Sequence, residues 1–181
     1  MKNTTSNTLV LLSGKGGTGK TTVSSALSCL IKNKVVIDCD VDAANLHIVL
    51  PHTQTAEYLI SSGKKAVIDK SICIECGLCE RKCRFDAIAN YVINELACEG
   101  CGFCAKICPM QAIALEPKIS GKIFESSLLD GSKFFYAKLV SGEGNSGKIV
   151  CELKSRASEF YGKDNWVIID GPPGIGCAVN A

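Results

Sequence analysis

Eight cysteines in the middle of the chain form a spacing pattern that occurs twice. The first run reads Cys-x₂-Cys-x₂-Cys-x₃-Cys, and a second run with the same spacing begins at Cys98. The eight positions are Cys73, Cys76, Cys79 and Cys83, then Cys98, Cys101, Cys104 and Cys108. Gly77 and Gly102 recur at the same offset, as does the segment Ala-Ile-Ala. Residues 64–118 are therefore a two-fold internal repeat, and its cysteine chemistry constrains what this segment can fold around.

The spacing resembles that of bacterial two-cluster ferredoxins. Three closely spaced cysteines wrap one [4Fe–4S] cube, and the fourth cysteine of each run reaches the other cube. We expect Cys73, Cys76, Cys79 and Cys108 to hold cluster one, and Cys98, Cys101, Cys104 and Cys83 to hold cluster two. Zinc is the competing interpretation, but zinc sites usually pair two Cys-x₂-Cys knuckles at larger separation. The polar N-terminal head resembles no secretory signal, which disfavours disulfides.

Arg84 departs from the ferredoxin pattern, because it stands where the first run often carries proline, as Pro109 does in the second. Proline is not a ligand there, so the eight ligands remain. Arg84 is a candidate for tuning a cluster or for binding a partner. Four further cysteines lie outside the repeat. Cys29 and Cys151 are expected to be small buried residues of helices, Cys39 to pack under a loop, and Cys177 to be a candidate for a redox or cluster-contacting role.

A glycine-rich loop joins a predicted strand at 9–13 to a predicted helix at 20–31. Gly14 to Thr21 reads Gly-Lys-Gly-Gly-Thr-Gly-Lys-Thr and fits G-x-x-x-x-G-K-[ST], the phosphate-binding loop. Its backbone N–H groups and the helix N-terminus favour phosphate. Lys20 is expected to contact the β- and γ-phosphates, and Thr21 to ligate Mg²⁺. The expected nucleotide-binding residues are Gly14, Lys15, Gly16, Gly17, Thr18, Gly19, Lys20, Thr21 and Thr22.

Carboxylates follow two predicted buried strands, at 34–38 and 166–170. The first strand runs into Asp38-Cys-Asp-Val-Asp42, and the second ends at Asp170 before Gly-Pro-Pro-Gly. Ligands of parallel sheets bind at the carboxyl ends of strands, where carboxylates can order water around Mg²⁺ or position an attacking water. Asp170 is the expected Mg²⁺ anchor, and Asp42 is expected to be a cap or turn residue.

The segment from Lys15 to Thr22 resembles the deviant phosphate loop of the MinD/ParA/Mrp and nitrogenase iron-protein class. The whole chain resembles a MinD-superfamily P-loop ATPase that contains an inserted two-cluster ferredoxin domain. The resemblance implies an ATP-sandwiched homodimer in which Lys15 reaches the partner's nucleotide. It also implies catalytic roles for Lys15, Lys20 and Asp40, with Asp40 acting on the attacking water and Asp38 lying near the Mg²⁺. A solvated surface lysine is the alternative for Lys15.

The expected fold is α/β: a parallel-sheet P-loop NTPase with a deviant Walker A loop, incomplete at the C-terminus, and an inserted bacterial-type ferredoxin α+β domain. We expect the first NTPase segment over residues 1–63, the ferredoxin domain over 64–118, and the second NTPase segment over 119–181. Three parallel strands are predicted, with a short β-rich excursion over 121–140, a loop over 142–148 and a helix over 149–161. The chain is expected to be the N-terminal portion of a longer protein, with an exposed apolar sheet edge and impaired nucleotide affinity.

Composition narrows the function. The net charge is +2, without a long basic run, so nucleic acid is not an expected partner. No run reaches the roughly 20 apolar residues of a membrane span, and a cytoplasmic location is expected. The expected function is coupling of MgATP binding or hydrolysis to electron transfer through two [4Fe–4S] clusters, with a redox partner. A Mrp-type carrier that delivers clusters to an apo iron–sulfur protein and a nucleotide-switch regulator are the alternatives. Whether this chain hydrolyses ATP is left open.

Overall fold

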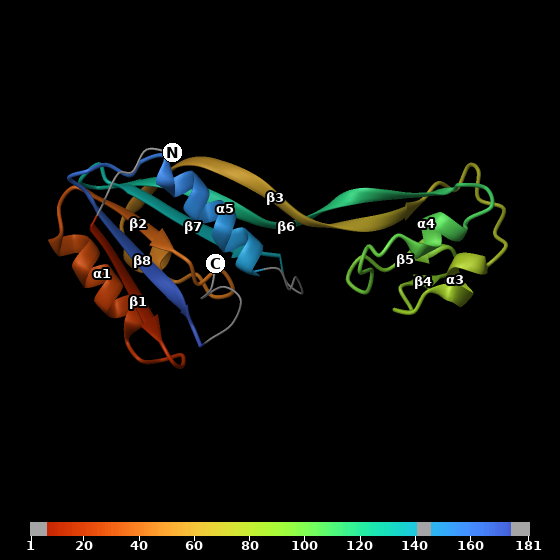
Figure 1. Cartoon of the computed structure of the whole chain (residues 1–181), viewed down its shortest axis with the longest axis horizontal. Helices are drawn as coiled ribbons and strands as arrows, with labels where there is room; N and C mark the ends of the chain where they lie inside the picture. Colours follow the sequence, from red (N-terminus) through yellow and green to blue (C-terminus); the bar gives the residue numbers. More distant parts are fainter. Residues whose placement is uncertain (1–6, 141–145, 175–181) are drawn as a thin grey trace. The chain divides into compact units, whose positions relative to one another are not determined.

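A computed structural model describes residues 7–140 and 146–174 (Figure 1). The chain divides into two compact units, one made of residues 1–60 and 121–181 and the other of residues 61–120. We call these the sheet unit and the cysteine unit. The boundaries of the cysteine unit lie close to those of the 64–118 segment expected from the repeat. Some of the expected 142–148 loop lies outside the described residues, but Ser146 already begins a helix.

A six-stranded sheet forms the frame, in the order β1-β8-β2-β7-β6-β3. Its strands are β1 (Asn7–Ser13), β8 (Trp166–Pro173), β2 (Lys34–Asp38), β7 (Lys133–Leu139), β6 (Ile113–Leu128) and β3 (His52–Ile68). The strands β1, β8, β2 and β7 are mutually parallel where they pair, and β6 is antiparallel to β7. The three strands predicted from the sequence are present as β1, β2 and β8.

The prediction for residues 121–140 is right that the segment is β-rich and wrong that it is a short excursion. Its second half is β7, a fourth parallel strand that pairs with β2 on one side and β6 on the other. Phe134, Phe135 and Ala137 of β7 are fully buried. A strand covered on both faces is a continuous apolar run without alternation, and the short run Lys-Phe-Phe-Tyr-Ala does not by itself distinguish a central strand from a local hairpin.

Helices cover both faces of this sheet. Strand β2 alternates between them: Val35 and Ile37 join the core under α5 (Ser146–Ser158), and Val36 joins the core on the other face. Helix α5 contributes an apolar stripe at helical spacing, made of Ile149, Val150, Leu153 and Ala157. Each fully buried aliphatic or aromatic side chain of these cores contributes about 1.5–3 kcal/mol.

The other face carries α1 (Lys20–Leu30) and α2 (Leu46–Val49), which pack against each other. Leu46 is completely buried, whereas α1 buries only Ser24 and Ser28. Strand β1 is an edge strand whose Val10 and Leu12 are 48% and 57% exposed. An apolar edge of the sheet was expected, and the structure has one at β1. None of the described helices is long and apolar enough to cross a membrane.

The cysteine unit repeats its backbone in step with its sequence. Helix α3 (Leu78–Lys82) and helix α4 (Phe103–Ile107) occupy equivalent positions in the two runs, and a glycine with positive φ precedes each. A hairpin of β4 (Ile88–Ala89) and β5 (Val92–Ile93) lies between them in the chain. Gly100 has a φ of 62° and lies against the carbonyl oxygen of Lys64, so a side chain there would collide with backbone.

Candidate functional site

The glycine-rich loop lies between β1 and α1 and borders a cavity of about 510 Å³. Gly17 and Gly19 have φ values of 75° and 84°, which side chains with a Cβ rarely adopt. Helix α1 begins directly after Gly19, so its N-terminal N–H groups lie beside the loop. The cavity is lined by Ser13, Gly16, Gly17, Thr18, Gly19, Lys20, Thr21, Thr22, Asp40, Asp42, Ala43, Asn45, Ser146, Pro172 and Pro173.

Lys20, Thr21 and Asp170 come together at this cavity. Lys20 Nζ donates to Asp170 Oδ1 at 2.7 Å, and the Thr21 hydroxyl donates to Asp170 Oδ2 at 2.9 Å. The Lys20 and Asp170 side chains are 8% and 1% exposed. Asp170 is far from the other two in sequence, and the parallel pairing of β1 with β8 brings the loop after β1 beside the end of β8. The geometry thus unites the expected phosphate-binding lysine with two of the expected Mg²⁺ ligands.

Asp38 is completely buried and braces the loop that follows β2. Its Oδ1 accepts a hydrogen bond from the backbone N–H of Asp40 at 3.1 Å, and its Oδ2 accepts one from Leu46 at 3.0 Å. Burial raises the pKa of Asp38 to about 7. Neither Asp38 nor Asp170 is among the cavity-lining residues. Both carboxylates have both oxygens in hydrogen bonds, Asp38 with backbone N–H groups and Asp170 with Lys20 and Thr21.

Asp40 lines the cavity and is half-buried, and this burial raises its pKa. The carbonyl of Asp40 accepts a hydrogen bond from Ala43 N–H at 3.1 Å, which closes a turn that contains the exposed Asp42. Asp42 is therefore in a turn, as predicted. Gly14 and Lys15 are exposed and lie outside the lining, so the structure does not join Lys15 to the cavity of its own chain.

Two lining residues, Ser13 and Ser146, were not predicted to bind the nucleotide, although each belongs to a glycine-rich segment of the sequence. Ser13 is the last residue of β1, and Ser146 is the first described residue of α5. Ser146 follows a glycine-rich segment at the start of a helix. Such a segment can contribute to a phosphate site only where the fold brings it next to the phosphate loop. Pro172 and Pro173 belong to the glycine-proline segment singled out after Asp170, and its last residues, with Cys177, lie outside the described residues.

The eight cysteines of the repeat border two separate cavities, four to each. We call the first quartet A: Cys73, Cys76, Cys79 and Cys108, which border a cavity of about 20 Å³. Quartet B is Cys83, Cys98, Cys101 and Cys104, which border a cavity of about 280 Å³. Each quartet therefore takes three cysteines from one run and the last cysteine of the other run, which is the grouping that the spacing predicted.

One thiol in each quartet has a raised pKa. Burial raises the pKa of Cys79 and of Cys104, and the neighbouring cysteines of each quartet add to the rise. In quartet A, the backbone N–H of Ala112 donates to Cys108 Sγ at 3.4 Å. Across residues 7–140 and 146–174, no three His, Cys, Asp or Glu side chains converge on a point where they could hold a single metal ion.

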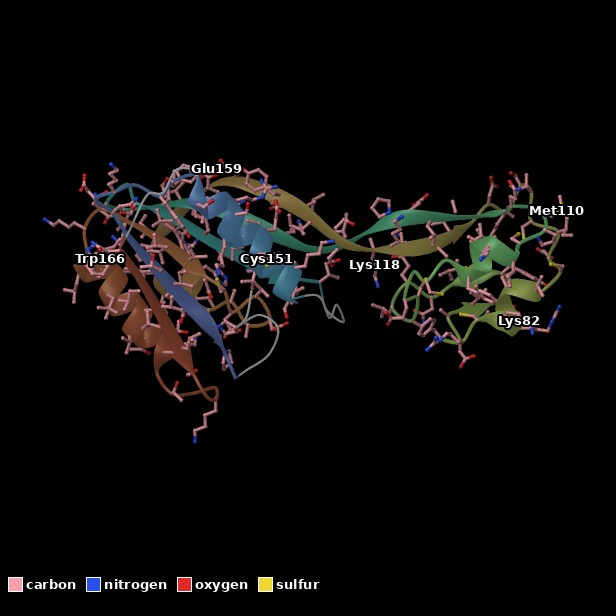
Figure 2. All side chains as sticks on the ribbon, viewed as in Figure 1. Lys82, Met110, Lys118, Cys151, Glu159 and Trp166 are labelled. Carbon is pink, nitrogen blue, oxygen red and sulfur yellow. The ribbon has the colours of Figure 1, made fainter. Side chains whose placement is uncertain are left out.

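Two predictions about the other cysteines are wrong. Cys29 and Cys151 are exposed and do not belong to the core, and Cys151 can be followed on α5 in Figure 2. Each helix turns a different face inward: α1 buries Ser28 and α5 buries Val150, each directly before the cysteine. Cys39 is 1% exposed, as predicted, and burial raises the pKa of its thiol to about 12.

Comparison with known proteins identifies the family of this chain. The model of the CobQ/CobB/MinD/ParA nucleotide binding domain matches residues 9–107. An uncharacterized protein of Methanocaldococcus jannaschii is 40% identical over 172 residues, which cover 93% of this chain and 60% of that protein. The chain thus spans about 60% of the length of this relative. Together with the phosphate-binding loop between β1 and α1, the match over more than half of the chain shows that it belongs to the CobQ/CobB/MinD/ParA nucleotide-binding family.

Proposed function

We propose that this chain binds MgATP in the sheet unit and two [4Fe–4S] clusters in the cysteine unit, and couples nucleotide binding or hydrolysis to electron transfer. One observation carries the proposal. The same chain forms a phosphate-loop cavity with Lys20, Thr21 and Asp170 in contact, and two cavities that are each bordered by four cysteines.

In the sheet unit, side chains of the chain can bind the phosphates and the Mg²⁺ of a nucleoside triphosphate. Lys20 gives a charge-assisted donor for phosphate oxygens, and the Thr21 hydroxyl and the Asp170 carboxylate give oxygen ligands for Mg²⁺. Asp40, which lines the same cavity, orients the attacking water. Asp38 positions Asp40 through the backbone of the 38–46 loop. Lys15, exposed and outside its own cavity, acts in the site of a second copy of the chain.

In the cysteine unit, the donor set suits iron–sulfur clusters. Thiolates in the spacing of two-cluster ferredoxins are typical [4Fe–4S] ligands, and each quartet surrounds an apolar cavity. When bound, the clusters would supply one-electron oxidation and reduction. Quartet A would hold cluster one and quartet B cluster two. Apolar side chains lie beside the thiols: Leu78, Met110 and Ile113 border quartet A, and Phe85, Ile88 and Phe103 border quartet B.

Chain connectivity supports the coupling. The loop that lines the nucleotide cavity ends at Asn45, the short helix α2 follows at once, and β3 begins at His52. Strand β3 then runs to Ile68, inside the cysteine unit. A nucleotide that reorders the 38–46 loop therefore acts on a segment that is joined directly to the strand leading to the cysteines.

Delivery of clusters to apo-proteins is a second candidate function, because one cysteine of each quartet is exposed. These are Cys76 and Cys101, and an acceptor's thiolates could reach a cluster there. The two functions are separated by mixing the loaded chain with an apo-ferredoxin. Clusters that stay on the chain while they cycle electrons support electron transfer, and clusters that move to the acceptor support the carrier.

The nucleotide-binding half of the proposal is tested by calorimetric titration of ATP with and without Mg²⁺. Asp170→Asn should remove most of the affinity gained from Mg²⁺, because it weakens an oxygen ligand of the ion. Asp42→Asn, at an exposed carboxylate of the cavity lining, is the matched control and should keep the Mg²⁺ effect. Equal Mg²⁺ dependence in both variants would remove Asp170 from the metal site.

A further inference from the structure

The two cysteine cavities have equivalent ligands but different borders. Lys82 and Arg84 border the quartet B cavity. The equivalent positions of the second run, on either side of Cys108, are occupied by Ile107 and Pro109. Two cations therefore flank the last cysteine of the first run, and two apolar residues flank the last cysteine of the second. Cluster binding by the cysteines does not require this difference in charge between the two halves of the repeat.

Two more residues extend these cations into a surface. Phe103 borders the same cavity and is 50% exposed, and Lys106 lies one helical turn further along α4. Helices α3 and α4 pack against each other. We define the basic face as Lys82, Arg84, Phe103 and Lys106. Arg84 also stacks over Phe85, with its guanidinium carbon 5.0 Å from the ring centroid. Lys82 is labelled in Figure 2.

The acidic residue that borders quartet B does not cancel this charge. Glu99 lines the cavity together with Lys82 and Arg84, which leaves one net positive charge in the lining. The equivalent residue at quartet A is Ile74, and the lining there contains no charged residue. Ile74 and Met110 are exposed instead, so the border of quartet A is apolar.

We propose that the basic face is the docking surface for an acidic electron-transfer protein, which exchanges electrons with the chain at quartet B. This inference rests on the proposed function, because it needs the cysteine quartets to be loaded. Exposed cations around a small aromatic patch favour an acidic partner, since complementary charge steers encounter and suppresses like-charged proteins. Arginine and aromatic residues are also the types enriched in protein interfaces. Direct contact at quartet B would bring the partner next to the cysteine ligands.

The test measures binding of a strongly acidic flavodoxin to the anaerobically loaded full chain, at a series of salt concentrations. The double variant Lys82→Gln with Arg84→Gln removes two charges and keeps side-chain length. The matched control is Lys64→Gln with Lys70→Gln, which removes two exposed charges of the same unit outside both cavity linings. We expect the first variant to bind the flavodoxin about tenfold more weakly at low salt, and the control to stay within about twofold of the natural chain. At high salt the difference should disappear.

Equal affinity of the two double variants, or flavodoxin binding that does not weaken with salt, would overturn the docking surface. Failure of the proposed function has a different signature. In that case the natural chain lacks iron and sulfide, or the small cation methyl viologen, once reduced, cannot reduce it. If methyl viologen passes one electron to both variants at the same rate, while only Lys82→Gln with Arg84→Gln slows transfer from reduced flavodoxin, the clusters are intact and the defect lies in docking.

Discussion

Lys20 and Asp170 form an ion pair between the phosphate loop and strand β8. Their contact at 2.7 Å with both side chains almost fully buried follows from the pairing of β1 with β8, which no local pattern encodes. Asp38 is a second completely buried carboxylate. The family resemblance implies that it lies near the Mg²⁺, and both of its oxygens accept hydrogen bonds from backbone N–H groups.

Substituting Lys20 by Gln should weaken ATP binding roughly 10- to 100-fold, because a hydrogen bond to a charged group contributes roughly 1.5–3 kcal/mol. Gln is chosen because its amide can still donate to the buried Asp170. Titration calorimetry of the loaded chain measures the affinity.

The matched control for this substitution is Lys32→Gln, at an exposed lysine just beyond α1. It should bind ATP like the natural chain, and both variants should keep their iron content. An affinity unchanged by Lys20→Gln would mean that the cavity between β1 and α1 is not where the phosphates bind.

Among the elements, one of the strands covered on both faces was not assigned to the parallel sheet. Strands β2 and β8 contain buried apolar runs that lead into Asp, and both were predicted. Strand β7 was predicted only as part of a short β-rich excursion, because neither its short apolar run nor the Asp130-Gly131 turn before it indicates a parallel partner. That turn does join β6 to β7, but β7 continues as the parallel partner of β2. Which strand pairs with β2 is decided by the tertiary fold and not by the turn.

An ion pair between Lys34 of β2 and Asp130 of the same turn links the strand to the turn. Lys34 Nζ donates to Asp130, and the Lys34 side chain is 1% exposed. This hydrogen bond lowers the pKa of Asp130 to about 2. Because the pKa is below its value of 3.8 in the unfolded chain, the pair stabilises the sheet unit fully above that value, and the contribution is lost as the pH falls toward 2.

Asp130→Asn should therefore lower the free energy of unfolding at pH 7 by roughly 1–3 kcal/mol, since it leaves the buried Lys34 without its charged partner. Between pH 5 and pH 3 the variant should also lose less stability than the natural chain. Urea unfolding, followed by fluorescence of the single tryptophan, Trp166 of β8, reports on this unit (Figure 2).

Glu152→Gln provides the comparison for a surface pair. Glu152 and Arg156 form an i,i+4 ion pair on α5, with side chains 42% and 33% exposed. Its removal should cost about 0.3–0.5 kcal/mol. If Asp130→Asn and Glu152→Gln lower the free energy of unfolding by the same amount, burial of Lys34 does not strengthen its ion pair with Asp130.

At the scale of the whole chain, the division into two units could be predicted from the cysteine repeat. The repeat recurs in α3 and α4 and in the glycines before them, because the same local sequence adopts the same backbone twice. The sequence did not predict that β3 and β6 are long strands with residues in both units. Residues 52–63 contain the short apolar run Tyr58-Leu59-Ile60 among polar residues, which by itself does not predict a strand of this length.

Because the two units are separate, a substitution in the cysteine unit should reduce bound iron without changing ATP affinity in the sheet unit. Cys76→Ser removes one member of quartet A and should lower bound iron by about half, while ATP affinity stays within about twofold. Cys29→Ser, an exposed cysteine of the sheet unit, should keep all of the iron. Iron and sulfide analysis together with ATP titration measure both quantities. Loss of ATP binding in Cys76→Ser would contradict the picture of two separately folded units.

Binding of MgATP in the sheet unit should change the redox behaviour of the clusters in the cysteine unit. An EPR-monitored redox titration of the anaerobically loaded chain, with and without MgATP, measures this coupling. We predict about eight iron atoms per chain and two cluster signals, at least one of which titrates at a different potential when MgATP is present. The same shift should be absent in Lys20→Gln. Titration curves that coincide with and without MgATP, at nucleotide concentrations that saturate binding, would contradict the coupling.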